Sequence, residues 1–159
     1  MSATHQKVAQ GEESRARLLE AAADLVGAGG YTATSVDAIA RRAGVVKSAL
    51  YWHFGSKNGL LLAALEHRTD QWIADVEAAV ERAAVPMERL DRLIDHIRDV
   101  ITERPETQRM VFSFLLERGH SDEACRQTIN RVFRRLVDAL NKGFSEAVQL
   151  PKAQLEDVA

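Results

Sequence analysis

Residues 31–65 read YTATSVDAIARRAGVVKSALYWHFGSKNGLLLAAL, and the first part of the fold can be predicted from them. Apolar residues recur at helical spacing over about 35–43 and again over about 46–52. Gly44 lies between the two segments and breaks the first. Two short helices joined by a turn that contains glycine have helix-turn-helix geometry. The sequence therefore predicts a helix-turn-helix over about 34–53.

The first of these helices opens with a capping pattern. Thr34 is followed three residues later by Asp37, which is the spacing of a capping box. We therefore predict Thr34 as the N-cap and Asp37 at the third helical position.

The second short helix and its exit carry groups that can meet a phosphate or a base edge. Leu50 and Phe54 are spaced to anchor this helix inward. A surface helix that carries Tyr, Trp and His together lowers solubility unless the rings contact a partner. A buried aromatic cluster explains the same spacing equally well, so both interpretations stay open at this point. The polar or amphipathic residues are Lys47, Ser48, Tyr51, Trp52, His53 and Lys57.

The rest of the chain predicts helices and no strands, so the fold class is all-α. Glycine and proline are sparse, and apolar residues repeat at helical spacing throughout. The expected flanking helices cover about 12–27, 57–83, 86–103, 106–118 and 122–148.

Composition excludes several classes of protein. The chain has 159 residues, of which 46% are hydrophobic and 28% charged, as in ordinary globular domains. Cys125 is the single cysteine, so neither an internal disulfide nor a four-cysteine zinc site is expected. No apolar run reaches the roughly 20 residues that span a bilayer, and the first 17 residues do not resemble a signal peptide. We expect a soluble, cytoplasmic protein with no membrane partner.

Charge is unevenly distributed. Residues 1–60 contain seven Lys/Arg and five Asp/Glu, whereas residues 61–159 contain fourteen and eighteen. A basic head on an acidic body suits a DNA-binding segment attached to a domain with another task, although a chance excess of a few charges gives the same count.

The stretch 31–65 resembles the DNA-binding signature of TetR-family transcriptional repressors. The resemblance rests on the Gly30-Tyr31 corner, the T-S-V-x-x-I-A helix, the A-G-V turn and L-Y-W-H-F-x-S-K, and it covers about 12–70. It implies a three-helix DNA-binding domain over 11–71, joined by a long helix to an all-helical ligand-binding and dimerisation domain over 72–159. It also implies a homodimer on a palindromic double-stranded operator, released by a small-molecule effector.

The resemblance implies roles for individual residues. The first turn of the second short helix would meet base edges, through Lys47, Ser48 and Ala49. Further contacts, mostly with phosphates and sugars, are implied for Thr34, Ser35, Tyr51, Trp52, His53 and Lys57. The chain departs from the family pattern at Val46, where Ser or Thr commonly caps the helix.

The second half would hold the effector and the dimer surface. The candidate pocket residues are large or polarisable side chains, although ordinary core packing explains most of them: Trp72, His96, Met110, Phe112, Phe114 and Phe133. The chain stops soon after Pro151, whereas family members generally continue with two more helices. An alternative function is therefore a truncated member that heterodimerises and binds DNA weakly.

The sequence contains no catalytic constellation. Its five histidines are scattered, without the H-x-x-x-H or H-E-x-x-H spacing of metal sites, and no glycine-rich phosphate loop follows a strand. We expect no enzyme activity, no metal and no cofactor, and repression as the family default.

Overall fold

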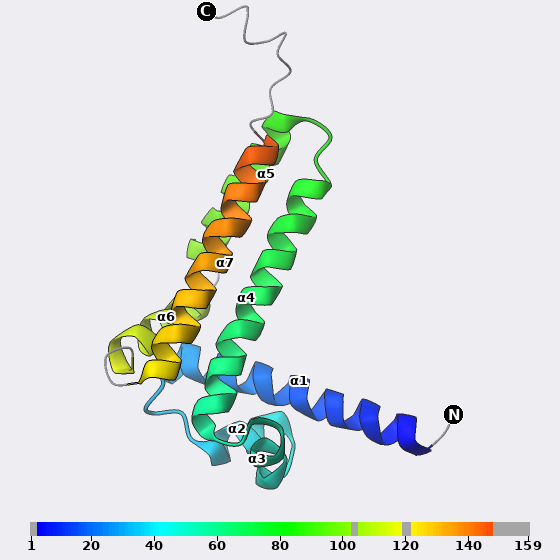
Figure 1. The fold of residues 1–159 in the computed structure, drawn as a ribbon, viewed down its shortest axis with the longest axis vertical. Helices are drawn as coiled ribbons and strands as arrows, with labels where there is room; N and C mark the ends of the chain where they lie inside the picture. Colours follow the sequence, from blue (N-terminus) through cyan, green and yellow to red (C-terminus); the bar gives the residue numbers. More distant parts are fainter. Residues whose placement is uncertain (1–2, 103–104, 119–121, 148–159) are drawn as a thin grey trace, which may run out of the picture. The chain divides into compact units, whose positions relative to one another are not determined.

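The computed structural model describes residues 3–102, 105–118 and 122–147. These residues form seven helices and no strand, which confirms the predicted all-α class (Figure 1). The helices are α1 (Ala3–Gly29), α2 (Val36–Ala43), α3 (Lys47–Phe54), α4 (Lys57–Glu81), α5 (Pro86–Thr102), α6 (Pro105–Glu117) and α7 (Glu123–Ala147).

The chain divides into two compact units that interleave along the sequence. The first unit comprises Met1–Arg68 and Pro105–Ile129, and the second comprises Thr69–Arg104 and Asn130–Ala159. The first unit therefore holds α6 as well as the helix-turn-helix. The functional division at 71/72 stays a prediction.

In the first unit α1 is the central helix, and α2, α3 and α6 pack against it. Leu18 and Val26 of α1 are fully buried, as are Ile39 of α2 and Leu50 of α3. Phe114 of α6 is also fully buried and meets the Tyr31 ring edge-on, with ring centroids 5.3 Å apart. This core fixes the short helices against a rigid support.

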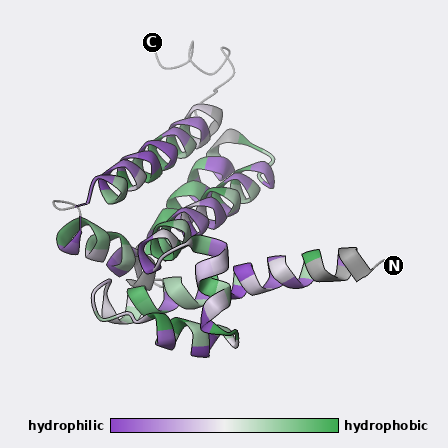
Figure 2. Cartoon of the chain, turned by 60° about the horizontal axis from the view of Figure 1, so that its bottom comes forward, coloured by the Kyte–Doolittle hydropathy of each residue, from purple (hydrophilic) through white to green (hydrophobic). Residues whose placement is uncertain are grey.

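The first helix is longer than predicted. It begins at Ala3 rather than near residue 12, and it ends at Gly29. The sequence over 3–11 has no apolar stripe, so periodicity gives no helical signal there. Apart from its grey N-terminal residues, the first half of α1 is coloured mainly white and purple with some green in Figure 2, as expected for a helical segment that buries little.

The second unit has its own small core. Val76 and Val80 of α4 and Leu93 of α5 are buried together, and Trp72, Ile97 and Leu140 pack around them. A side chain at Gly143 would lie only 3.3 Å from Leu93 Cδ2, so glycine allows α7 to approach α5 closely. Two ion pairs join α4 to α7, Asp70 with Arg135 and Glu77 with Lys142.

Among the described residues no helix is long and apolar enough to cross a membrane. The same part of the chain contains no group of three or more His, Cys, Asp or Glu side chains that could hold a metal ion.

Candidate nucleic-acid interface

The helix-turn-helix consists of α2 and α3 and the three residues between them. Gly44 adopts a left-handed conformation (φ 65°), and its N–H donates to the carbonyls of Ala40 and Arg41. The N–H of Val45 also donates to Ala40 O, at 3.1 Å. Glycine is favoured here because a Cβ is strained at positive φ. The turn therefore ends α2 abruptly and redirects the chain into α3.

The cap of α2 lies one residue later than predicted. Ser35 is the N-cap, and its hydroxyl oxygen accepts from the N–H of Ala38 at 3.1 Å. The predicted capping box with Thr34 is therefore wrong. Ser35 is exposed and keeps its hydroxyl hydrogen, so it still suits the predicted contact with a phosphate.

Thr34 has a structural role. It is only 4% exposed, and its hydroxyl donates to Gly30 O at 2.7 Å. A buried hydroxyl with its hydrogen already committed is not available to donate to a phosphate. Thr34 therefore does not suit the predicted contact with a phosphate.

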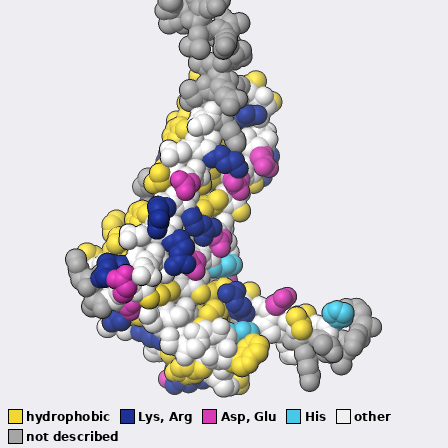
Figure 3. Space-filling model, in the orientation of Figure 1, with side chains coloured by type: hydrophobic (Ala, Val, Ile, Leu, Met, Phe, Trp, Pro, Cys, Tyr) yellow, Lys and Arg dark blue, Asp and Glu magenta, His cyan; other side chains and the backbone are white. Residues whose placement is uncertain are grey.

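One face of α3 is buried and the opposite face is exposed. Leu50 is fully buried, whereas Tyr51 is 47% and Trp52 79% exposed. Lys47 and Ser48 are exposed in the first turn, and Ala49 is half-buried. Where α2 and α3 lie, Figure 3 shows hydrophobic side chains on the surface. The exposed rings exclude the interpretation of Tyr51 and Trp52 as a buried cluster.

His53 follows Trp52 on α3. Its ring lies edge-on to Trp52, with centroids 4.5 Å apart. Partial burial, and secondarily the positive charge of Arg15, lowers the pKa of His53. The imidazole is therefore neutral at neutral pH and can serve as a hydrogen-bond donor, not as a fixed charge.

Two basic side chains of the helix-turn-helix, Lys47 and Arg42, form ion pairs with carboxylates. Lys47 Nζ lies 3.0 Å from Asp37 Oδ1, and this hydrogen bond and charge raise the pKa of Lys47. Arg42 donates to Asp24 at 2.7 Å. Both pairs are exposed, so each holds its cation weakly and a phosphate can compete for it.

Lys57 lies at the corner between α1 and α2. It is half-buried, and its ammonium donates to Tyr31 O at 3.0 Å and lies 4.9 Å from the centroid of the Tyr31 ring. Burial lowers its pKa. Lys57 therefore supports the corner in this structure, and a phosphate contact would have to use its remaining donors.

The same corner is held by a residue that sequence reasoning missed. Glu117 at the end of α6 accepts from the backbone N–H of Tyr31 at 3.0 Å and of Thr32 at 2.8 Å. A Cβ at Gly30 would lie 2.8 Å from Glu117 Oε1, so glycine makes room for the carboxylate. The partners lie 85 and 86 residues apart, and no local pattern signals such a contact.

A second link ties the corner to the start of α7. Tyr31 donates its hydroxyl to Asn58 Oδ1 at 2.9 Å, and Asn58 donates to Asp122 at 3.0 Å. Asp122 also accepts from Arg118 and from the N–H of Cys125. We call Glu117, Tyr31, Asn58 and Asp122 the corner network.

The predicted pocket residues fall into different surroundings. Met110 and Phe114 are buried in the core of the first unit, and Phe112 on the same helix is 57% exposed. In the second unit Phe133 is 44% exposed. Trp72 and His96 lie together there, with ring centroids 5.8 Å apart. Trp72 and His96 are therefore the candidates whose rings lie side by side in the second unit.

Val46 precedes α3 as an N-cap without a side-chain hydrogen bond. Replacing it with serine supplies a side-chain acceptor for an amide of the first turn, so Val46→Ser should stabilise the protein by about 1 kcal/mol. Chemical denaturation of Val46→Ser measures this gain. Val46→Ala is the matched control, because it removes the same exposed side chain without adding a cap. Equal stability of the two variants would contradict the capping argument.

These features define a helix-turn-helix protein of the class that binds duplex DNA. The model of the family "Bacterial regulatory proteins, tetR family" matches residues 18–64, the segment that contains α2 and α3. The transcriptional repressor KstR2 of Mycobacterium tuberculosis is 30% identical over 155 residues, which cover 89% of this chain and 72% of KstR2. The chain belongs to the TetR family.

Two further proteins are similar to this chain, one in sequence and one in structure. The transcriptional activator FasR of Mycolicibacterium smegmatis is 36% identical over 101 residues, which cover 64% of this chain but only 46% of FasR. The structure of a transcriptional regulator from Saccharomonospora viridis in complex with choline superposes with a TM-score of 0.71 at 23% identity, covering 86% of this chain and 70% of that one. The second likeness concerns the fold alone.

Proposed function

We propose that this chain is a sequence-specific DNA-binding transcriptional regulator, a repressor that a small-molecule ligand releases from its operator. It acts as a homodimer, through binding and without catalysis, in the bacterial cytoplasm where the DNA lies. The relatives include a repressor and an activator by name, and repression is the family default that we adopt.

The observation that carries the proposal is the exposed face of α3. Leu50 anchors the helix in the core, while Trp52, at 79% exposure, projects away from it. An exposed indole with an N–H donor beside Lys47 and Ser48 suits a surface of phosphates and base edges. Lys47 can donate to guanine, Ser48 to any base, and Ala49 can contact a thymine methyl.

The effector site that we propose lies at Trp72 and His96. The indole Nε1 of Trp72 is buried and has no hydrogen-bond partner in the part of the chain that the structure describes. A buried N–H without an acceptor costs free energy, and a ligand with an acceptor atom would recover it. A ligand that binds more tightly to the dimer conformation with low DNA affinity would shift the population toward that conformation and so release the DNA.

A binding titration tests the function. DNA from immediately upstream of the gene is titrated at low and moderate salt in the presence of unrelated competitor DNA. We expect preferential binding with two or more chains per site, because operator specificity relies on two half-sites about one helical turn apart. Binding without sequence preference that fades with salt would contradict the proposal and favour a heterodimerising protein.

Trp52→Ala should weaken DNA binding at least tenfold, which corresponds to about 1.4 kcal/mol. Large aromatic side chains in a desolvated interface carry much of its affinity, and Trp52 is exposed before binding. Phe112→Ala is the control, because Phe112 is also an exposed aromatic residue but lies on α6. Similar affinities of the two variants in an anisotropy titration would show that Trp52 does not contact DNA.

A further inference from the structure

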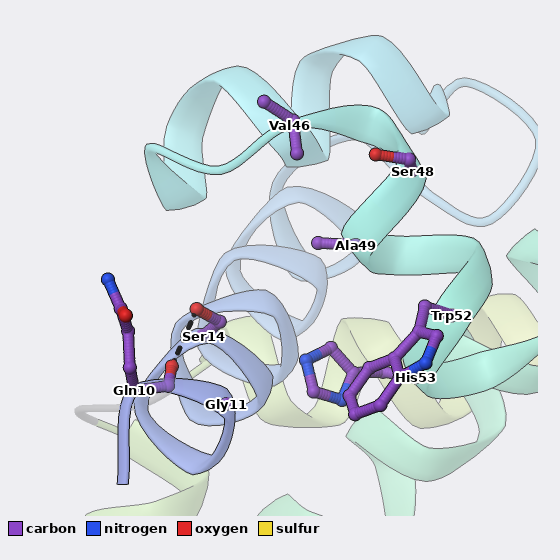
Figure 4. Close-up of a pocket in the computed structure, with 8 residues that line it drawn as sticks. All are labelled: Gln10, Gly11, Ser14, Val46, Ser48, Ala49, Trp52 and His53. Atoms are coloured by element: carbon purple, nitrogen blue, oxygen red, sulfur yellow. Dashed lines mark hydrogen bonds between the residues drawn. The ribbon is translucent and has the colours of Figure 1, made fainter. Parts of the chain in front are cut away.

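A cleft lies between the first half of α1 and one face of α3. Its volume is about 490 Å³, and α1 forms one wall with Gln10, Gly11 and Ser14. Figure 4 shows Gln10 rising on one side of the cleft and the rings of Trp52 and His53 on the other. The wall from the helix-turn-helix consists of Val46, Ser48, Ala49, Trp52 and His53.

Glycine at position 11 lowers the stability of α1 relative to other residues. It lies within α1, where glycine destabilises a helix by about 1 kcal/mol relative to alanine. Its φ is negative, because the only glycines of the described chain with positive φ are Gly30, Gly44 and Gly55. A Cβ at Gly11 would meet no atom within 4 Å. Neither backbone conformation nor packing within the chain explains this glycine, whereas close approach of an external molecule would.

The side chains beside Gly11 can bind an acceptor. Gln10 is exposed, and its side-chain amide makes no hydrogen bond within the described residues. The hydroxyl of Ser14 donates to Gln10 O at 2.8 Å, so its hydrogen is committed within α1. Across the cleft, Ser48 and the indole of Trp52 supply further donors. The cleft thus offers donors on both walls.

We propose that this cleft holds the sugar–phosphate backbone of one DNA strand, so that α1 is a second DNA-contacting element beside α3. The inference rests on the proposed function, because the strand is that of the operator bound by α3. The backbone passes over Gly11, where no side chain obstructs it, and the Gln10 amide donates to a phosphate oxygen.

The character of the cleft favours a strand backbone as its occupant. Ser48 and Ala49 line the cleft and also belong to the turn that reads bases, so the cleft continues the DNA-binding face. Apolar surface from Val46, Ala49 and Trp52 suits a deoxyribose, and the donors suit its phosphates. Lys47, next to Ser48 in the sequence, adds a cation whose exposed pair with Asp37 a phosphate can displace.

Gly11→Leu and Gln10→Ala test this assignment in the full-length chain. A leucine at position 11 obstructs the cleft, and Ala9→Leu is its matched control, because residue 9 is rotated about 200° from residue 11 around the helix. None of the three variants disturbs the core, since residues 9 and 10 are exposed and a Cβ at residue 11 meets no atom within 4 Å. The melting temperature of Gly11→Leu should be equal to or a few degrees above that of the wild type.

We expect Gly11→Leu to weaken binding at least tenfold and Gln10→Ala about threefold, by the same factor on operator and on unrelated DNA. Contacts to phosphate and sugar carry no sequence information, which is why the two factors should agree. Ala9→Leu should bind within twofold of the wild type. Hydroxyl-radical footprints should lose protection of the deoxyriboses that face α1 only in the Gly11→Leu complex.

Two results overturn the assignment and leave the proposed function intact. In the first, Gly11→Leu binds as tightly as Ala9→Leu while the wild type binds its operator. In the second, the loss occurs on the operator alone, so that α1 reads bases instead of holding the backbone. A wild type that binds no DNA preferentially would instead overturn the proposed function, and the α1 contact with it.

Discussion

Phe114→Ala should lower the free energy of unfolding by about 3–5 kcal/mol. The side chain is fully buried in the first unit, where it packs edge-on against Tyr31. Its removal loses the transfer free energy of the ring and leaves a cavity beneath the corner between α1 and α2. For a chain of this length the melting temperature should fall by roughly 10 °C.

The control for this prediction lies two residues away on the same helix. Phe112 is 57% exposed, so Phe112→Ala should change stability by less than about 0.5 kcal/mol. The comparison holds residue type and helix constant and varies burial alone. Equal losses for the two variants in urea denaturation would mean that Phe112 is covered in solution.

The apolar residues of α6 show why the residues of an effector pocket could not be predicted from the sequence. Met110, Phe112 and Phe114 are all large apolar side chains on one helix, and periodicity alone gives α6 no single buried face. The structure buries Met110 and Phe114 and exposes Phe112. Composition identified residues able to line a pocket, but burial depends on neighbours from helices distant in the sequence.

The helix-turn-helix was predictable because its signals are local. Gly44 ends α2 through its own conformation, and Leu50 lies at the spacing that buries one face of α3. The exposure of Trp52 was not predictable in the same way, since exposed and buried aromatic clusters share one spacing. The packing of α3 against α1 decides it.

The N-cap of α2 and the start of α1 were predicted wrongly for identifiable physical reasons. Thr34 and Ser35 both carry a hydroxyl that can cap a helix, and the sequence does not say which does so. The hydrogen bond from Thr34 to Gly30 O makes Thr34 part of the corner, and Ser35 then caps α2. The first half of α1 was missed because a helix without a buried face has no apolar period.

The corner network links the end of α6 and the start of α7 to the segment between α1 and α2. Glu117 on α6 binds the backbone at Tyr31 and Thr32, immediately before α2. Asn58 connects Tyr31 on one side with Asp122 on the other. Any movement of α6 would therefore act directly on the segment that positions the helix-turn-helix.

Glu117→Ala should lower the free energy of unfolding by about 2 kcal/mol at neutral pH. The carboxylate accepts from two backbone amides, and each hydrogen bond to it contributes about 1 kcal/mol after discounting for solvent exposure. Glu117→Gln keeps one acceptor oxygen without the charge, so it should lose about half as much. Urea denaturation of both variants measures these losses, and Glu13→Gln on the exposed face of α1 is the control for removing a carboxylate.

The pH dependence of the free energy of unfolding distinguishes the contribution of the Glu117 charge from that of its hydrogen-bond acceptors. Hydrogen bonds from the side chain and backbone amide of Thr32, with others from Tyr31 and Ser113, hold the pKa of Glu117 below its ordinary value. A carboxyl whose folded pKa is depressed stabilises the protein above its unfolded pKa, which is about 4.3, and that contribution is lost as the pH falls through the folded pKa. The stability difference between wild type and Glu117→Gln should therefore be constant from pH 7 to about 5 and shrink below that. A difference that stays constant down to pH 3 would show that the charge of Glu117 does not stabilise the corner.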